Sequence, residues 1–143
     1  MIEKLNSHGI TLVESFADGV SKLVKKKESN SIVFFVRIGY FATSISLLKV
    51  HKPVSEFKRQ KLAEGSFSDI FFAWAGGKEY AVKSQRIKGK DRLAYTADLD
   101  SILQEYLLYK VAAVLGFGPQ MERIFGYDLV CYNDRIEFAM ELC

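Results

Sequence analysis

The chain has 143 residues, of which 49% are hydrophobic and 26% charged, and its formal net charge is +3. This composition predicts one globular domain, with or without an attached extension, and argues against a disordered chain. Two cysteines, Cys131 and Cys143, are too few for a disulfide framework, and no Cys/His cluster in the sequence indicates a metal site. The N-terminus lacks the pattern of a signal peptide, so we expect a cytoplasmic protein.

The charges are unevenly distributed along the chain. Residues 1–63 carry 11 Lys/Arg and 5 Asp/Glu, whereas residues 64–143 carry 9 and 12. Such an asymmetry can mark an arm for nucleic acid or anionic lipid, but it is more often a solvated face. Neither an RNA-binding aromatic signature nor a zinc finger accompanies it, so we do not expect a nucleic-acid partner.

Residues 11–24 have the pattern of an amphipathic helix. Thr11 and Glu14 have the spacing of a capping box. Apolar residues then recur at helical spacing, namely Leu12, Phe16, Val20, Leu23 and Val24. Three lysines follow, where the helix dipole favours cations. We predict a helix that packs on a neighbouring domain and ends in the polar linker KKKESNS.

Residues 31–50 (SIVFFVRIGYFATSISLLKV) are long and apolar enough to be considered as a membrane span. Arg37 alone would cost roughly 2.5 to 3.5 kcal/mol at the bilayer centre, which offsets most of the gain from the apolar side chains. A span at 31–50 is therefore not favoured, although it stays open. We predict instead a strand over residues 32–38 followed by a short helix.

From residue 57 onward the pattern is three strands, one helix and two strands. The predicted strands are FKRQKLAEG, DIFFAWAG and KEYAVKSQ, then MERIFGYDLVCY and RIEFAMEL. Gly-Gly at 76–77 and Asn133-Asp134 predict hairpin turns. Thr96 or Asp98 can cap the helix, and Gly116 fits the position just past its end.

We therefore predict an α+β fold with two parts. Residues 57–143 would form a five-stranded antiparallel sheet with one principal helix. Residues 1–56 would form a mainly helical N-terminal extension. What this extension does is not indicated by the sequence.

One lysine lies where a buried strand is expected. Lys83 ends the apolar run Tyr80-Ala81-Val82 and shares a face with Ala81 by the alternation of a strand. A buried ammonium is costly unless it is paired, and Glu105 in the following helix is the candidate partner. Two interpretations stay open: the two side chains pair over the sheet, or both are exposed and do not meet.

From about Lys61 to Cys143, roughly 83 of the 143 residues, the chain resembles the N-terminal lobe of a protein kinase. LAEGSFSDI resembles the Gly-rich loop, and YAVK resembles the strand motif that carries the nucleotide-binding lysine. LQEYLLYKVAAVLGFGP is similar to the following helix with its glutamate, and EFAMEL to the strand that runs into the hinge. These motifs occur in register with one another.

The resemblance implies a site for ATP. Lys83 would contact the α- and β-phosphates and be held there by Glu105. The remaining implied residues are the loop residues Gly65, Ser66, Phe67 (at the tip) and Ser68, the adenine-pocket residues Ile70 and Ala81, the gatekeeper Met140, and the hinge residues Glu141 and Cys143.

The sequence departs from the kinase pattern in two respects. Of the three glycines of G-x-G-x-x-G only Gly65 is present, since Ala63 and Ser68 occupy the other places, and Asp69 adds a negative charge near the phosphate path. The chain also contains neither H-R-D nor D-F-G. ATP is expected to bind with Mg²⁺ whose ligands lie on a second lobe outside this chain, so the chain alone should be inactive.

Three functions follow from these observations. The first is the ATP-binding lobe of a protein kinase, of the Ser/Thr class, with the second lobe elsewhere. The second is a non-catalytic, pseudokinase-like interaction or regulatory module with a protein partner. The third keeps the lobe but transfers phosphate to a small molecule.

Overall fold

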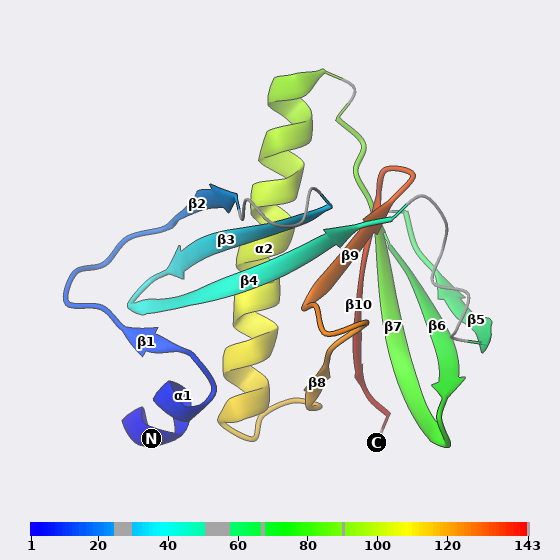
Figure 1. Ribbon diagram of the computed structural model, residues 1–143, viewed down its shortest axis with the longest axis horizontal. Coiled ribbons are helices and arrows are strands. Elements are labelled where there is room, and N and C mark those ends of the chain that lie inside the picture. The colour runs from blue at the N-terminus through cyan, green and yellow to red at the C-terminus, as the bar shows by residue number, and fades with distance from the viewer. Residues whose placement is uncertain (25–29, 51–57, 67, 90, 143) are drawn as a thin grey trace.

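The computed structural model describes residues 1–24, 30–50, 58–66, 68–89 and 91–142 (Figure 1). These residues form one mixed sheet of ten strands and two helices. The predicted five-stranded antiparallel sheet is therefore wrong, because the strands of the N-terminal part extend the same sheet. The predicted helical extension is wrong for the same reason.

The N-terminal part consists mostly of strands. Its elements are α1 (Ile2–Ser7), β1 (Thr11–Leu12), β2 (Gly19–Val24), β3 (Ser31–Ile38) and β4 (Phe41–Lys49). The helix predicted over residues 11–24 is replaced by β1 and β2, because β2 pairs with the apolar strand β3 along its whole length. The apolar stripe of the predicted helix is not buried as a helix would bury it: Phe16 is 67% and Leu23 56% exposed.

The hairpin of β3 and β4 occupies most of the long apolar segment at residues 31–50. The strand predicted over 32–38 is confirmed by β3, but the short helix predicted after it is wrong. Gly39 has a φ of 60° and turns the chain, so that Ile38 pairs with Phe41. Thr43, Ile45 and Leu47 are then buried on one face of β4. Within the described segments, neither helix is long and apolar enough to cross a membrane.

The C-terminal part begins with the three predicted strands, which are confirmed. They are β5 (Lys58–Glu64), β6 (Ser68–Ala75) and β7 (Lys78–Arg86), and each pairs antiparallel with the next. The predicted turn at Gly76-Gly77 is confirmed as well: both glycines have positive φ, and Ala75 pairs with Lys78.

The remaining elements are α2 (Arg92–Val114), β8 (Met121–Glu122), β9 (Leu129–Tyr132) and β10 (Arg135–Glu141). The helix begins earlier than predicted, because its N-cap is Asp91, whose carboxylate accepts a hydrogen bond from the Ala94 N–H at 2.8 Å. The predicted end is confirmed by Gly116, which has a φ of 83° just past the C-cap. The predicted hairpin across Asn133-Asp134 is also confirmed.

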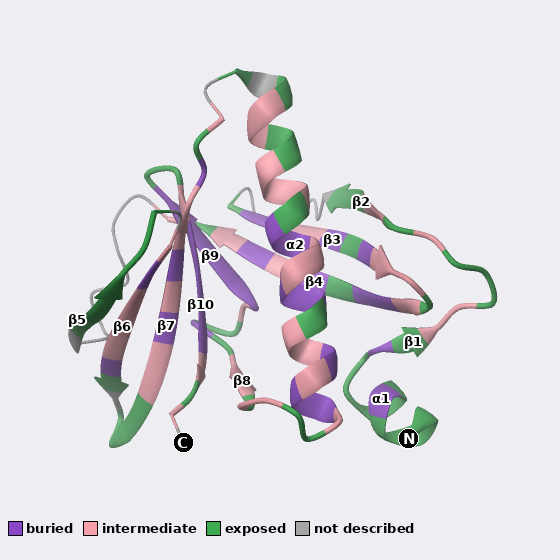
Figure 2. Ribbon diagram, turned by 180° about the vertical axis from the view of Figure 1, so that it is seen from behind, coloured by how far each residue is buried: buried purple, intermediate pink, exposed green. Residues whose placement is uncertain are grey.

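The strand order is β2-β3-β4-β9-β10-β7-β6-β5, and the pair β4/β9 is parallel. This pair makes the sheet continuous across the predicted division into residues 1–56 and 57–143. Helix α2 lies against β2, β3, β4 and β8 (Figure 1). The buried residues of α2, β3, β4 and β10 meet in the main core (Figure 2), which includes Phe34, Ile45, Leu103, Leu107 and Phe138. The N-terminal strands therefore support the helix that carries Glu105.

Candidate nucleotide-binding site

Lys83 and Glu105 meet over the sheet. Lys83 lies on β7, and its ammonium donates a hydrogen bond to Glu105 Oε1 on α2 at 2.8 Å. The other carboxylate oxygen accepts from Gln85 Nε2 at 3.3 Å, two residues further along β7. The Lys83 side chain is 14% exposed and that of Glu105 is 38% exposed. Of the two interpretations of this lysine, the paired one is therefore present in the structure.

A tyrosine completes the surroundings of the ammonium. Lys83 Nζ also donates to Tyr109 Oη at 3.1 Å, and it lies 5.2 Å from the centre of the Tyr109 ring. Tyr109 is four residues after Glu105, so both side chains leave the same face of α2. Tyr109 is not among the site residues predicted from the sequence, although its spacing from Glu105 was the available signal.

The pKa of Lys83 is the result of opposing effects. Burial lowers it, but the hydrogen bonds and the charges of Glu105 and Tyr109 raise it above the ordinary value of 10.5. The ammonium is therefore charged at neutral pH. A charged, partly exposed donor held by two neighbours is suited to bind an anion.

The described residues between β5 and the first residues of β6 are Gly65, Ser66 and Ser68, and we call them the Gly65 turn. The Gly65 N–H donates to the Ser68 carbonyl at 2.7 Å. A Cβ on Gly65 would come within 2.8 Å of that same carbonyl oxygen, so the turn requires glycine here. Ser66 is exposed and Ser68 half-buried. Phe67, the predicted tip of the loop, lies outside the described residues.

The remaining predicted residues divide between the two faces of the sheet. Ile70 pairs with Lys83 and Met140 pairs with Ala81, so all four share one face, and the three apolar ones are half-buried. Glu141 is opposite Tyr80 on the other face, and its N–H donates to the Gln120 carbonyl at 2.8 Å. This N–H is thus already occupied within the protein. Cys143 lies outside the described residues.

Asp69 is the residue whose negative charge the kinase-like pattern predicts near the phosphates, unless its side chain points away from them. It pairs with Ser84, so its side chain lies on the face opposite to Lys83, where it is 1% exposed. Burial alone would raise its pKa. The Arg135 hydrogen bond and the charges of Lys61, Arg86 and Arg135 instead lower it below the ordinary value of 3.8.

Replacing Asp69 with asparagine should change how the stability of the fold depends on pH. A carboxyl whose pKa is lowered by folding contributes stability above its unfolded pKa and loses it as the pH falls through the folded pKa. The difference in free energy of unfolding between the natural chain and Asp69→Asn should thus be largest near neutral pH. It should shrink below about pH 4. Urea unfolding between about pH 2.5 and 7 measures it; a difference that is constant over this range would contradict the lowered pKa.

Among the described residues, no group of three or more His, Cys, Asp or Glu side chains is arranged to hold a metal ion. Mg²⁺ bound together with ATP stays a prediction.

Neither a known family model nor a curated protein sequence matches this chain significantly. The resemblance to a kinase lobe stays a prediction from the sequence.

Proposed function

We propose that this chain is the ATP-binding lobe of a phosphotransferase of the protein-kinase type, with a Ser/Thr acceptor. The observation that carries the proposal is the ion pair between Lys83 on the third strand of an antiparallel meander and Glu105 on the next helix, at 2.8 Å. In protein kinases a strand lysine and a helix glutamate must pair in this way for phosphoryl transfer.

The surroundings of the pair support a nucleotide ligand. The ammonium supplies a fixed positive charge for the α- and β-phosphates, and it needs little rearrangement because Glu105 and Tyr109 already hold it. Ile70, Ala81 and Met140 offer half-buried apolar surface on the same face of the sheet, which suits the adenine ring.

In this proposal the chain contributes binding and electrostatic stabilisation rather than the whole reaction. Lys83 would offset the negative charge that develops on the phosphates during transfer. The groups that position the acceptor hydroxyl and hold Mg²⁺ in kinases come from H-R-D and D-F-G, and neither motif occurs in these 143 residues. Phosphoryl transfer would need a second lobe that supplies them.

A second candidate is a non-catalytic interaction module, and the Gly65 turn favours it. The turn has one of the three glycines, and the Gly65 N–H is already bound to Ser68 at 2.7 Å. Fewer backbone donors are then available to phosphate. If this candidate is correct, Lys83→Met should leave binding of a protein partner unchanged.

Titration of the purified chain with ATP tests the proposed function. We expect weak binding, with a Kd on the order of 1 mM, because the described residues of the proposed site offer the phosphates the Lys83 ammonium and leave the apolar face open. Adding Mg²⁺ should strengthen binding by less than about threefold, since its ligands are expected elsewhere. Calorimetry would measure both values. Absence of binding at about 10 mM ATP would contradict the proposal and favour the interaction module.

A further inference from the structure

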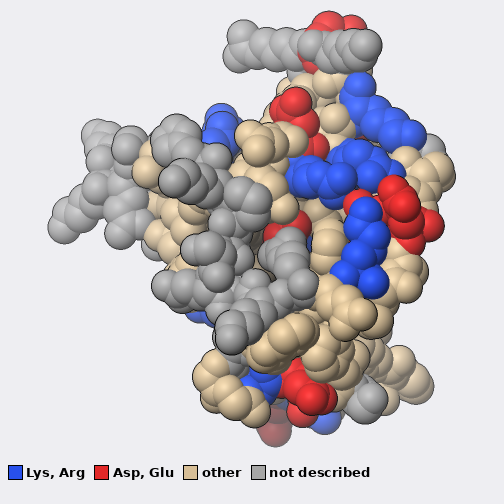
Figure 3. Space-filling view, turned by 90° about the vertical axis from the view of Figure 1, so that its right-hand side faces the viewer, with Lys and Arg blue, Asp and Glu red and all other residues tan. Residues whose placement is uncertain are grey.

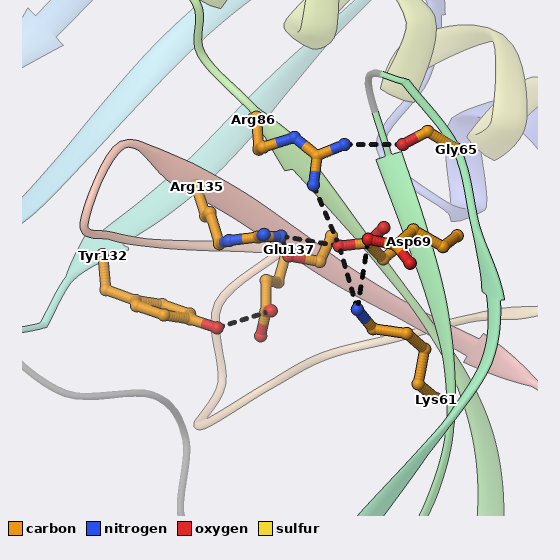
Figure 4. A network of polar contacts seen from close by, with 9 residues as sticks. Lys61, Gly65, Asp69, Arg86, Tyr132, Arg135 and Glu137 are labelled. Atoms are coloured by element: carbon orange, nitrogen blue, oxygen red, sulfur yellow. Dashed lines mark hydrogen bonds and ion pairs between the residues drawn. The ribbon is translucent and has the colours of Figure 1, made fainter.

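Figure 4 shows a cluster of charged side chains. It lies on the face of the sheet opposite to Lys83, because Asp69 pairs with Ser84. We call Asp69, Arg86 and Arg135 the Asp69 cluster. Oδ2 of the buried Asp69 accepts hydrogen bonds from Arg86 Nη1 at 3.2 Å and from Arg135 Nη1 at 3.1 Å. Lys61 Nζ is 4.0 Å from the same oxygen. The three members come from β6, β7 and β10, so the cluster joins neighbouring strands.

The two arginines use the rest of their guanidinium groups differently. Arg135 Nη1 also donates to Ser84 Oγ at 3.1 Å, which lies within the sheet. Arg86 Nη2 instead donates to the Gly65 carbonyl oxygen at 2.6 Å. Arg86 thus connects a buried carboxylate to the Gly65 turn. On this side of the molecule basic and acidic side chains lie next to one another (Figure 3).

We propose that Arg86, held by Asp69, is a positioning residue that fixes the Gly65 turn beside the nucleotide site. This inference rests on the proposed function for its effect on ATP. Its structural part, which does not depend on ATP, is that the Arg86 contact holds the Gly65 backbone in one conformation.

The chemistry of the three groups supports this role. A guanidinium is planar and stays protonated, and its separate N–H donors can hold a carboxylate and a carbonyl at the same time. Asp69 already holds Nη1 of Arg86. The Arg86 side chain therefore loses little further conformational entropy when its Nη2 donates to the Gly65 carbonyl oxygen. A turn held in place before the ligand arrives costs less to order when phosphate binds.

The test compares variants of the two arginines in the full chain. Arg86→Gln removes the contact with Gly65, and Arg135→Gln removes a guanidinium from the same carboxylate without removing that contact. Arg86→Lys keeps the positive charge beside Asp69 but loses the guanidinium, whose two Nη groups reach the Asp69 carboxylate and the Gly65 carbonyl oxygen at the same time. This variant separates the carbonyl contact from the charge.

The first measurement is hydrogen exchange of the Gly65 amide by NMR without nucleotide. We expect about tenfold faster exchange in both Arg86→Gln and Arg86→Lys, and less than twofold in Arg135→Gln. Equal exchange in the natural chain and the Arg86 variants would overturn the proposal. So would equal acceleration by Arg135→Gln, since the effect would then be general loosening of the cluster.

The second measurement is ATP affinity together with the unfolding temperature. Arg86→Gln should weaken ATP binding about three- to tenfold more than Arg135→Gln at a similar unfolding temperature. If ATP binds and the two variants weaken it equally, the role in nucleotide binding is wrong. If the natural chain binds no ATP, the proposed function fails instead, and Gly65 exchange alone decides whether Arg86 positions the turn.

Discussion

Replacing Lys83 with methionine is expected to abolish measurable ATP binding. Methionine keeps the length of the side chain but removes the cation that the proposed site offers to the phosphates. A hydrogen bond to a charged group contributes about 1.5–3 kcal/mol, so its loss weakens binding at least about tenfold. From a Kd near 1 mM such a loss moves the Kd above about 10 mM, the highest ATP concentration of the titration, whereas losses below tenfold stay measurable. Titration at pH 7 is the measurement, because the raised pKa of Lys83 keeps the ammonium charged there.

Two further variants show whether a loss of ATP binding is specific to Lys83 and its partner. Lys78→Met changes an exposed lysine at the start of the same strand and should leave the affinity within about twofold. Glu105→Gln keeps the shape of the partner but removes its charge, so it should weaken binding by about five- to tenfold. ATP binding that survives Lys83→Met would place any nucleotide site elsewhere and would remove the main support for the proposed function.

The sheet strands of the C-terminal part could be predicted because their signals are local. Alternation along β6 and β7 and the Gly-Gly turn between them depend on neighbouring residues only. The same kind of local signal failed for residues 11–24, where a capping-box spacing and an apolar period both matched a helix. There the pairing of β2 with β3 determines the structure, and such pairing overrides local propensity.

Only the part of the candidate site that depends on local signals could be predicted. Lys83 and Glu105 were identified from their place in the strand and the helix, but their 2.8 Å contact depends on how α2 is rotated over the sheet. The Asp69 cluster was missed entirely. Asp69 is 17 residues from Arg86 and 66 from Arg135, and no spacing rule connects positions so far apart. Their contact follows from strand pairing, which only the folded chain defines.

The largest expected loss of stability comes from the N-terminal strands and is tested by two adjacent phenylalanines. Phe34 on β3 is 3% exposed in the main core under α2, whereas Phe35 on the other face of the strand is 38% exposed. Phe34→Ala should lower the free energy of unfolding by about 3–5 kcal/mol, since it leaves a cavity in a packed core. A fold of ordinary stability has only about 5–15 kcal/mol in total. Phe35→Ala is the matched control and should cost less than about 1 kcal/mol.

The same pair tests whether residues 1–50 hold the helix that carries Glu105. Because α2 lies against β2, β3 and β4, a cavity at Phe34 should loosen the helix and lengthen the time that Glu105 spends away from Lys83. We therefore expect Phe34→Ala to weaken ATP binding as well, and Phe35→Ala to leave it unchanged. Urea unfolding and calorimetry on both variants measure the two effects. Equal losses of stability would contradict the packing of β3 on α2. A loss of stability in Phe34→Ala without any loss of affinity would mean that the Lys83–Glu105 pair does not depend on the N-terminal strands.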